Sequence, residues 1–169
     1  MKNDLEITKA QIFDVTAIYA FIFEHGVNPW NYLSHQYIGA HLAEIESGKT
    51  QGLLIRLDGE IAGLTTFTSS TELARYQALE HLGSVHGYIS EAVVHHERAG
   101  HGIGTTLLRA AVAELAAQGH KEIYAERHEE NKASAGMMRK AGFVEIDVFE
   151  DLDRRAAGSR RTSVSRLIL

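Results

Sequence analysis

Three alternating glycines, Gly100, Gly102 and Gly104, stand between an apolar strand-like segment, 87–95, and an apolar-faced helix that begins at Ile103. Glycine permits backbone conformations that other residues avoid, and it lets the main chain come close to a ligand. The first amides of a helix lack helical partners and lie at the positive end of its dipole. Such a strand–turn–helix unit is suited to phosphate or pyrophosphate, although it can also serve only as a tight connection.

The spacing of this turn separates it from two common phosphate-binding motifs. A P-loop requires a lysine after its last glycine, whereas Gly104 is followed by Thr105 and Thr106. A dinucleotide-binding fold opens its first βαβ unit with GxGxxG, but the pattern here is GxGxG, and few βα units follow it. A dinucleotide enzyme with Glu122 or Glu126 as its ribose-binding acid is kept as an alternative.

The rest of the sequence alternates strand-like and helix-like segments. Strands are predicted at residues 5–8, 52–57, 60–67, 87–95, 122–127, 143–149 and 162–169, and helices at 15–23, 34–46, 103–118 and 132–140. Asp14 is expected to cap the first helix, and Asp58-Gly59 between two apolar runs predicts a type I′ hairpin turn. No repeat or linker interrupts the pattern, so a single domain over residues 1–169 is expected.

Composition excludes several classes of function. The 169 residues include no cysteine, so disulfides, a thiolate nucleophile and a cysteine zinc site are excluded. The net charge of −5 argues against a general nucleic-acid binder. Residues 1–10 are polar and lack the apolar core of a signal peptide, and no apolar run approaches the ~20 residues that span a bilayer. A cytoplasmic protein without a membrane partner is expected.

Ten histidines raise the question of a metal site. His95 and His96 are adjacent, and adjacent residues of a strand point to opposite faces. His81 and His86 flank a glycine, and the HExxH pattern of zinc enzymes does not occur in the sequence. The sequence therefore predicts no metal site.

Two blocks of the chain resemble the GCN5-related N-acetyltransferase (GNAT) superfamily. The block from Glu91 to Leu108 is similar to that family's strand and pyrophosphate loop, usually written Arg/Gln-x-x-Gly-x-Gly/Ala. The block from Glu130 to Phe143 is similar to its Asn-x-x-Ser/Ala helix, which ends in Gly-Phe. The resemblance covers essentially the whole chain and points to the phosphinothricin acetyltransferase-type branch. Two positions depart from the pattern: Ala99 replaces the usual Arg or Gln, and His96 stands where proline is frequent.

The resemblance implies an α/β (α+β) fold with a mixed, mostly antiparallel central sheet of about six to seven strands, helices on both faces and two splayed parallel strands. Acetyl-CoA would lie in the V-shaped opening between those two strands. The expected contacts are the backbone of Ala92, Val93 and Val94 with the pantetheine arm, Gly100, His101, Gly102, Ile103, Gly104 and Thr105 with the pyrophosphate, and Asn131 with the pantetheine or phosphate region. Asn131 has a second interpretation as the N-cap of its helix.

The implied reaction is direct attack of a primary amine on the thioester in a ternary complex, and the missing cysteine argues against an acetyl-enzyme. An alkyl ammonium must first lose a proton, so a general base is expected. Glu91 is the leading candidate, with a structural charge as its alternative, and His95 and Glu126 are weaker candidates. The family's glutamate usually lies two or three residues before Glu91, at positions that Ile89 and Tyr88 occupy here. The backbone amide of Val94 would polarise the thioester carbonyl.

A general acid for the leaving thiolate is harder to assign. Family members often place a tyrosine on the second helix, and Met138 stands there in this chain. Water, another tyrosine such as Tyr124, or no acid at all are the alternatives. This gap motivates a second hypothesis, a non-catalytic acyl-CoA-binding or sensing module, beside that of an N-acetyltransferase with a small-molecule or amino-acid-like acceptor.

The acceptor site is expected near the second helix. Trp30, Tyr32 and Tyr37 would either pack in the core or line that site. The segments 26–36 and 68–86 are expected to decide the acceptor, and 68–86 is predicted to be a loop with one helical turn. The polar run 151–161 is interpreted as a solvated turn, and homodimers are an assembly that the resemblance implies.

Overall fold

A seven-stranded sheet forms the centre of the computed structural model, which describes residues 5–31 and 33–169. Its strands are β1 (Ile7–Lys9), β2 (Thr50–Leu57), β3 (Glu60–Ser70), β4 (His86–Val94), β5 (Glu122–His128), β6 (Val144–Glu150) and β7 (Arg161–Ile168). Their order is β1-β2-β3-β4-β5-β7-β6, and every neighbouring pair is antiparallel except β4 and β5. This mixed sheet confirms the predicted fold class, and it differs from the parallel sheet of a dinucleotide-binding fold.

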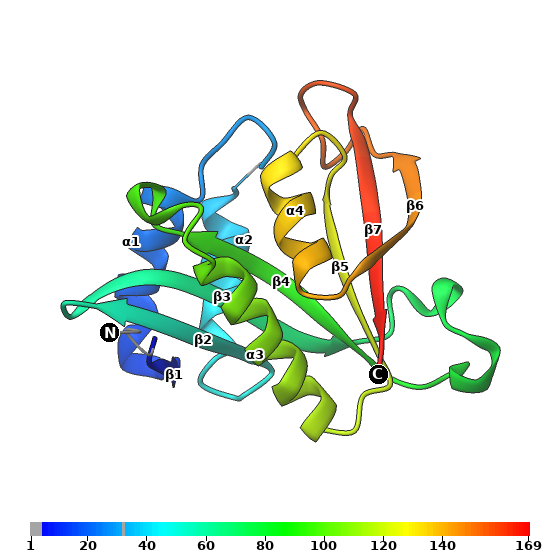
Figure 1. Ribbon diagram of the computed structural model, residues 1–169, viewed down its shortest axis with the longest axis horizontal. Helices are drawn as coiled ribbons and strands as arrows, with labels where there is room; N and C mark the ends of the chain where they lie inside the picture. The colour runs from blue at the N-terminus through cyan, green and yellow to red at the C-terminus, as the bar shows by residue number, and fades with distance from the viewer. Residues whose placement is uncertain (1–4, 32) are drawn as a thin grey trace.

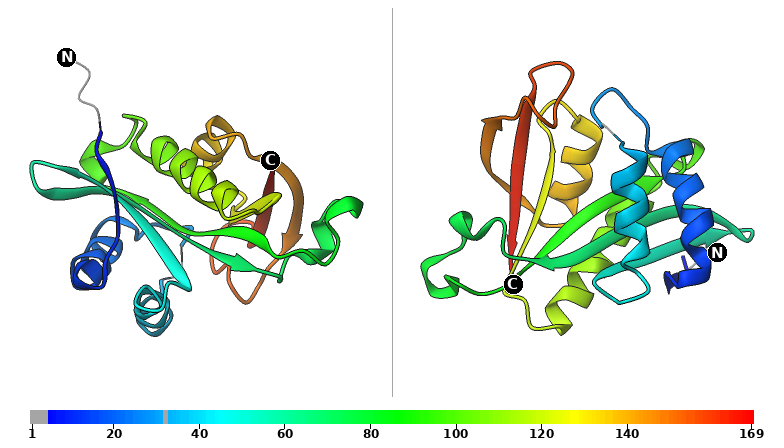
Figure 2. Two further views of the ribbon diagram at one scale, coloured as in Figure 1. Left: turned by 90° about the horizontal axis from the view of Figure 1, so that it is seen from below. Right: turned by 180° about the vertical axis from the view of Figure 1, so that it is seen from behind.

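Helices cover both faces of the sheet (Figures 1 and 2). The longer helices are α1 (Val15–His25), α2 (His35–Ala43), α3 (Ile103–Ala117) and α4 (Lys132–Lys140), and the 3₁₀ turns are Ile12–Asp14, Ala74–Tyr76, Leu79–His81 and His96–Arg98. One core lies between α1, α2 and the sheet and includes Ile18, Ile38 and Leu54. A second core lies on the opposite face and includes Leu107 and Met138. No helix of the described part of the chain is long and apolar enough to cross a membrane.

Local signals in the sequence account for the turns that join these elements. The hairpin between β2 and β3 places Asp58 at φ +52° and Gly59 at φ +84°, as a type I′ turn requires. Gly119 and Gly142 follow α3 and α4 with φ of +92° and +103°, so both helices end where a left-handed residue is tolerated. Ser34 caps α2, because its hydroxyl accepts a hydrogen bond from the Tyr37 amide at 3.2 Å.

The prediction that Asp14 caps the first helix is wrong. Its carboxylate accepts no hydrogen bond from α1. Instead it accepts one from the Gln11 amide at 2.8 Å and one from the Arg56 guanidinium at 2.8 Å. Asp14 therefore closes the 3₁₀ turn ahead of α1 and ties it to β2, which is a tertiary role that local sequence spacing does not reveal.

Residues 71–85 form the predicted loop, with two 3₁₀ turns rather than one helical turn. The loop projects from the end of the sheet that lies far from the start of α3 (Figure 1). Leu73 and Tyr76 in this loop pack beside Tyr124 of β5 and Val164 of β7. The loop thus covers one end of the β5–β7 region.

Candidate active site

Strands β4 and β5 separate after a short paired stretch. Their parallel ladder joins only Gly87–Ile89 to Ile123–Ala125, and the strands diverge beyond it (Figure 1). On its other edge β4 is paired with β3 as far as its end, with one interruption. Glu91 pairs with Thr66 and Ile89 pairs with Phe67, so Ser90 has no partner on β3 and forms a β-bulge. A bulge of this kind bends a strand and increases its twist, which favours the divergence from β5.

The backbone of β4 beyond Ile89 alternates between β3 and the opening. The His95 amide donates to Ala62 O at 3.0 Å, and Thr65 Oγ1 donates to Glu91 O at 2.9 Å, so these odd-numbered residues face β3. Because successive residues of a strand turn their hydrogen-bonding groups to opposite edges, Ala92 and Val94 direct theirs into the opening.

The side chains of β4 follow the same alternation. Val93 packs into the core beneath α1 and α2, whereas Ala92 and Val94 pack towards α3. All three residues line the opening, as the sequence predicts, but only Ala92 and Val94 present backbone groups to it. A ligand that adds to this edge would pair with those two residues.

The opening widens into a cavity of about 860 Å³. Its walls come from five parts of the chain that are distant in sequence: residues 26–31 with 33 and 34, β4, the turn before α3, the first two turns of α4, and residues 153–155. Tyr37 from α2 and Glu126 from β5 contribute polar side chains. A space of this size and composition is typical of a site for a small molecule.

The glycine turn closes one end of this cavity. Gly100 and Gly102 both have φ of +81°, and Gly102 immediately precedes α3. The Thr106 amide is the first of α3 to bond back, to Gly102 O at 2.9 Å. The amides of residues 103–105 therefore lack helical partners at the positive end of the helix dipole, and all three residues line the cavity.

Gly104 has a packing role in addition. A Cβ at this position would lie 2.3 Å from Met137 Sδ, so α3 approaches α4 as closely as glycine allows. His101 is exposed, its Nδ1 lies 3.0 Å from Ala99 O, and it is not among the residues that line the cavity. Of the six residues predicted for the turn, His101 is thus the one that the structure leaves outside.

Asn131 has the helix-capping role foreseen for it, and it lies in the cavity wall. Its Oδ1 accepts the Ser134 amide at 3.1 Å, which makes it the N-cap of α4, and the residue also lines the cavity. Met138, one turn beyond Ser134 on α4, is buried in the core beneath α3 and reaches the same cavity. Its sulfur lies 3.5 Å from Ser134 Oγ.

Glu91 lies on β4, two residues beyond the last pair of the β4–β5 ladder, and it lines the cavity together with Tyr37. Burial raises the pKa of Glu91 to about 7. Burial also raises the pKa of Tyr37, and the nearby carboxylate of Glu91 adds to that rise. A carboxyl group with a pKa near neutrality is half ionised at physiological pH, so it can accept a proton there and release it again.

The other proposed bases differ from Glu91 because they already have partners. His95 Nδ1 accepts a hydrogen bond from the Glu97 amide at 3.2 Å. Glu126 accepts hydrogen bonds from Tyr88 Oη at 2.9 Å and from two nitrogens of Arg154 at 3.0 and 3.1 Å. Arg154 also donates to Asp151 at 2.8 Å. Burial and Glu126 together raise the pKa of Tyr88 well above its ordinary value, so Tyr88 stays protonated.

The interpretation of 151–161 as a solvated turn is confirmed for most of the run, which is exposed, but it misses what the first part of the run contacts. Asp151 is buried, and Asp153, Arg154 and Arg155 line the cavity. The sheet order explains the error, because β7 lies between β5 and β6 and brings the β6–β7 connection next to the end of β5. The acidic and arginine residues at 151–155 were the one feature of the sequence that could have indicated a place in the site. An exposed surface turn has the same composition, so this feature did not distinguish the two.

Other residues that the sequence suggested for the site lie outside the cavity. No residue of 68–86 lines it, because that loop covers the opposite end of the sheet. Tyr124 is fully buried beneath the same loop and donates to Glu122, so it does not reach the site. Trp30 packs against His128 with ring centroids 4.8 Å apart, and Tyr32 lies outside the described residues.

His95 and His96 do not point to opposite faces as predicted. Strand β4 ends at Val94, and the chain turns at His95 into the 3₁₀ turn that starts at His96. The two imidazole rings consequently stack with centroids 4.9 Å apart, and His25 from the end of α1 joins them.

Comparison with known proteins places the arrangement in a wider context. No curated protein matches the sequence significantly. An N-acetyltransferase from Staphylococcus aureus superposes with a TM-score of 0.77 at 18% identity, over 98% of this chain and 99% of that one. A ribosomal-protein-alanine N-acetyltransferase from Brucella melitensis superposes at 0.74 and 20% identity, over 98% and 100%.

A third similar structure was solved with its acetyl-CoA. It is a putative acetyltransferase from Salmonella typhimurium, with a TM-score of 0.74 and 18% identity, over 99% of this chain and 95% of that one. The sequence model described as "Acetyltransferase (GNAT) family" matches residues 14–143, which is more than half of the chain. The expected co-substrate, acetyl-CoA, is the one that this family match supports. The chain belongs to the acetyltransferase (GNAT) family.

Proposed function

We propose that residues 1–169 form a single acetyl-CoA-dependent N-acetyltransferase domain that acts on the primary amine of a small-molecule or amino-acid-like acceptor. The observation that carries the proposal is the continuous cavity from the glycine turn to Glu91 along the separated strands β4 and β5. Such a cavity can hold a long, phosphorylated thioester at one end and an amine at the other.

The residues along the opening fit acetyl-CoA. The free amides of residues 103–105 suit a pyrophosphate, and the open backbone of Ala92 and Val94 suits the amide groups of a pantetheine arm. Acetyl-CoA supplies the activated acyl group as a thioester. The Val94 amide, turned into the opening, is the group proposed to donate to the thioester carbonyl oxygen, and such a donor is typically worth about 10²–10³ in rate.

Glu91 is the proposed general base. An ammonium group beside it would transfer a proton to the carboxylate, directly or through water, and the neutral amine would then attack. The pKa of about 7 makes the carboxylate a stronger base than an ordinary glutamate, yet leaves half of it ionised at neutral pH. Glu126 is proposed instead to hold Tyr88 and Arg154 in place, because both of its oxygens already accept hydrogen bonds.

The acceptor end favours a small polar amine. Tyr37, Asn28 and Asn31 line the cavity. Arg154 and Arg155 line it too, and the Arg154 guanidinium is bonded to Glu126 and Asp151. An amine flanked by a hydrogen-bonding or acidic group matches this mixture of an acid, hydroxyl, amides and cations. A peptide or protein amino terminus is the competing acceptor, since one structural relative is a ribosomal-protein-alanine N-acetyltransferase.

A panel of amines tests the proposal. Free amino acids, small diamines and short peptides are incubated with acetyl-CoA, and thiol release is recorded. Saturable release with a small amine is the expected result, and release with peptides alone would reassign the acceptor. Thermal stabilisation by acetyl-CoA without turnover of any amine would instead favour the non-catalytic acyl-CoA-binding hypothesis. No stabilisation at millimolar acetyl-CoA would refute both.

A further inference from the structure

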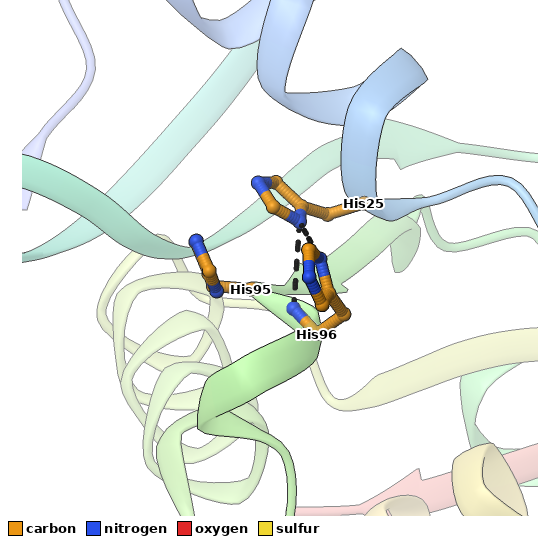
Figure 3. Close-up of side chains that lie close together, drawn as sticks. All are labelled: His25, His95 and His96. Atoms are coloured by element: carbon orange, nitrogen blue, oxygen red, sulfur yellow. Dashed lines mark hydrogen bonds between the residues drawn. The ribbon is translucent and has the colours of Figure 1, made fainter.

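Three histidines from two distant parts of the chain converge beside the cavity (Figure 3). His25 is the last residue of α1, and His95 and His96 follow the end of β4. One ring nitrogen from each lies within 4.8 Å of the other two. Among residues 5–31 and 33–169, this is the one grouping of three histidine, aspartate or glutamate side chains compact enough to share a metal ion.

The hydrogen bonds of His25 reveal where its lone pair points. His25 Nδ1 lies 2.7 Å from His96 Nδ1 and accepts the His96 backbone amide at 3.4 Å. Nδ1 therefore acts as the acceptor, and the proton of the neutral ring resides on Nε2. Nε2 lies 3.8 Å from a carboxylate oxygen of the exposed Glu24, which is beyond hydrogen-bond distance.

The surroundings hold the His25 ring against the other two. The His25 side chain is only 4% exposed. Its ring centroid lies 4.0 Å from that of His95 and 4.8 Å from that of His96.

We propose that His25, His95 and His96 form a binding site for a divalent transition-metal ion of the zinc class, with solvent completing the coordination. Imidazole is a good ligand for Zn²⁺, and three protein ligands with one open position are a common arrangement. The ion would replace the proton shared between His25 Nδ1 and His96 Nδ1. Tetrahedral bonds of about 2.05 Å place the ligand nitrogens about 3.3 Å apart. The 2.7 Å between His25 Nδ1 and His96 Nδ1 must therefore widen, separations of up to 4.8 Å within the cluster must close, and exposed His96 has room to move.

The position of the site gives it a structural consequence. The ion would join the end of α1 to the turn that leads directly into Gly100 and the start of α3. It would thus fasten a wall of the cavity to the segment proposed to hold the pyrophosphate. The inference itself depends only on the three imidazoles and stands whether or not the chain acetylates an amine.

Metal titration of the intact chain tests the site. Zn²⁺ alone is titrated against a chromophoric chelator, and Co²⁺ is followed by its visible absorption bands, which report tetrahedral nitrogen ligation. One equivalent of each ion is expected. Since loss of an outer-shell partner costs about 10–100-fold in affinity, His96→Ala and His25→Ala should each weaken Zn²⁺ binding at least about 100-fold. His120→Ala, which removes a histidine outside the cluster, is the matched control and should keep the full affinity.

Thermal unfolding supplies an independent readout. Saturating Zn²⁺ should raise the Tm by roughly 5 to 10 °C, and His96→Ala should abolish the rise while the metal-free Tm stays near that of the parent, because the His96 side chain is exposed. His96→Ala therefore keeps the test valid even if His25→Ala unfolds. The inference is overturned if no stoichiometric equivalent binds, or if Zn²⁺ affinity and the Co²⁺ bands survive in His96→Ala.

Discussion

Replacing Glu91 by glutamine should lower activity and raise stability at the same time. Glutamine has nearly the same shape as glutamate but cannot accept a proton at neutral pH. A positioned general base contributes about 10²–10⁴ to a rate, so kcat should fall by that factor while the Kd for acetyl-CoA changes little. A residue needed only for folding would show the opposite effect on stability.

The expected stability gain follows from the pKa of Glu91. Burial raises that pKa from 4.5 to about 7, so the folded state retains a proton that the unfolded state loses between those pH values. Stability of the parent therefore falls as the pH rises through this window, by about 1.4 kcal/mol per pKa unit, or about 3 kcal/mol in all. Glutamine does not titrate, so Glu91→Gln avoids the loss.

Two measurements at several pH values check this prediction. Urea unfolding should give nearly equal free energies of unfolding for the parent and Glu91→Gln at pH 4.5, and a gain of about 3 kcal/mol for the variant at pH 8. The parent's kcat/KM should rise with pH through about 7, and this rise should be absent from the residual activity of the variant. Glu60→Gln, at an exposed hairpin position, is the control and should change neither quantity.

Two results would contradict the proposed role of Glu91. A variant that is less stable than the parent at pH 8 would mean that the Glu91 carboxylate has a stabilising partner when ionised. Unchanged kcat with an intact pH dependence would mean that the proton goes elsewhere, and Glu91 would then be a structural charge.

Three further substitutions test other parts of the argument. Gly104→Ala should weaken acetyl-CoA binding by roughly tenfold in calorimetry, because its Cβ would meet Met137 Sδ at 2.3 Å and displace that side chain, which lines the same cavity. Arg154→Ala should lower the free energy of unfolding in urea by about 1–3 kcal/mol, because it leaves the buried Glu126 carboxylate without its cation. The decrease is smaller than for a fully buried ion pair, since the arginine is half exposed to solvent. Leu54→Ala, at a fully buried position, should cost about 2–5 kcal/mol in the same assay.

Much of the local structure was predictable because its causes lie within a few residues. The bounds predicted for α4, 132–140, agree with the structure, since Asn131 begins the helix and Gly142 follows its end. The hairpin at Asp58-Gly59 is likewise a property of two adjacent residues. The helix after Asp14 was placed correctly, but the role of Asp14 was not, because its partner Arg56 is 42 residues away.

The residues of the candidate site were predictable only where they belong to a recognisable sequence motif. The stretch from Glu91 to Val94 lines the cavity, and so does the glycine turn apart from His101. The segment 68–86 was assigned to the wrong end of the sheet, because a loop's sequence does not say which edge it covers. Arg154 was missed because it is 28 residues from Glu126 along the chain, and the strand order alone makes them neighbours.

The helices, the strands, the tight turns and the glycine turn before α3 follow from the order of the amino acids, because backbone preference and apolar periodicity act over short distances. How far β4 and β5 stay paired, how deeply Glu91 is buried and which histidines meet depend on the packing of distant elements. His25 and His96 are 71 residues apart in sequence. Their contact depends on α1 packing across the end of β4, and such packing is fixed by the complementary surfaces of whole elements.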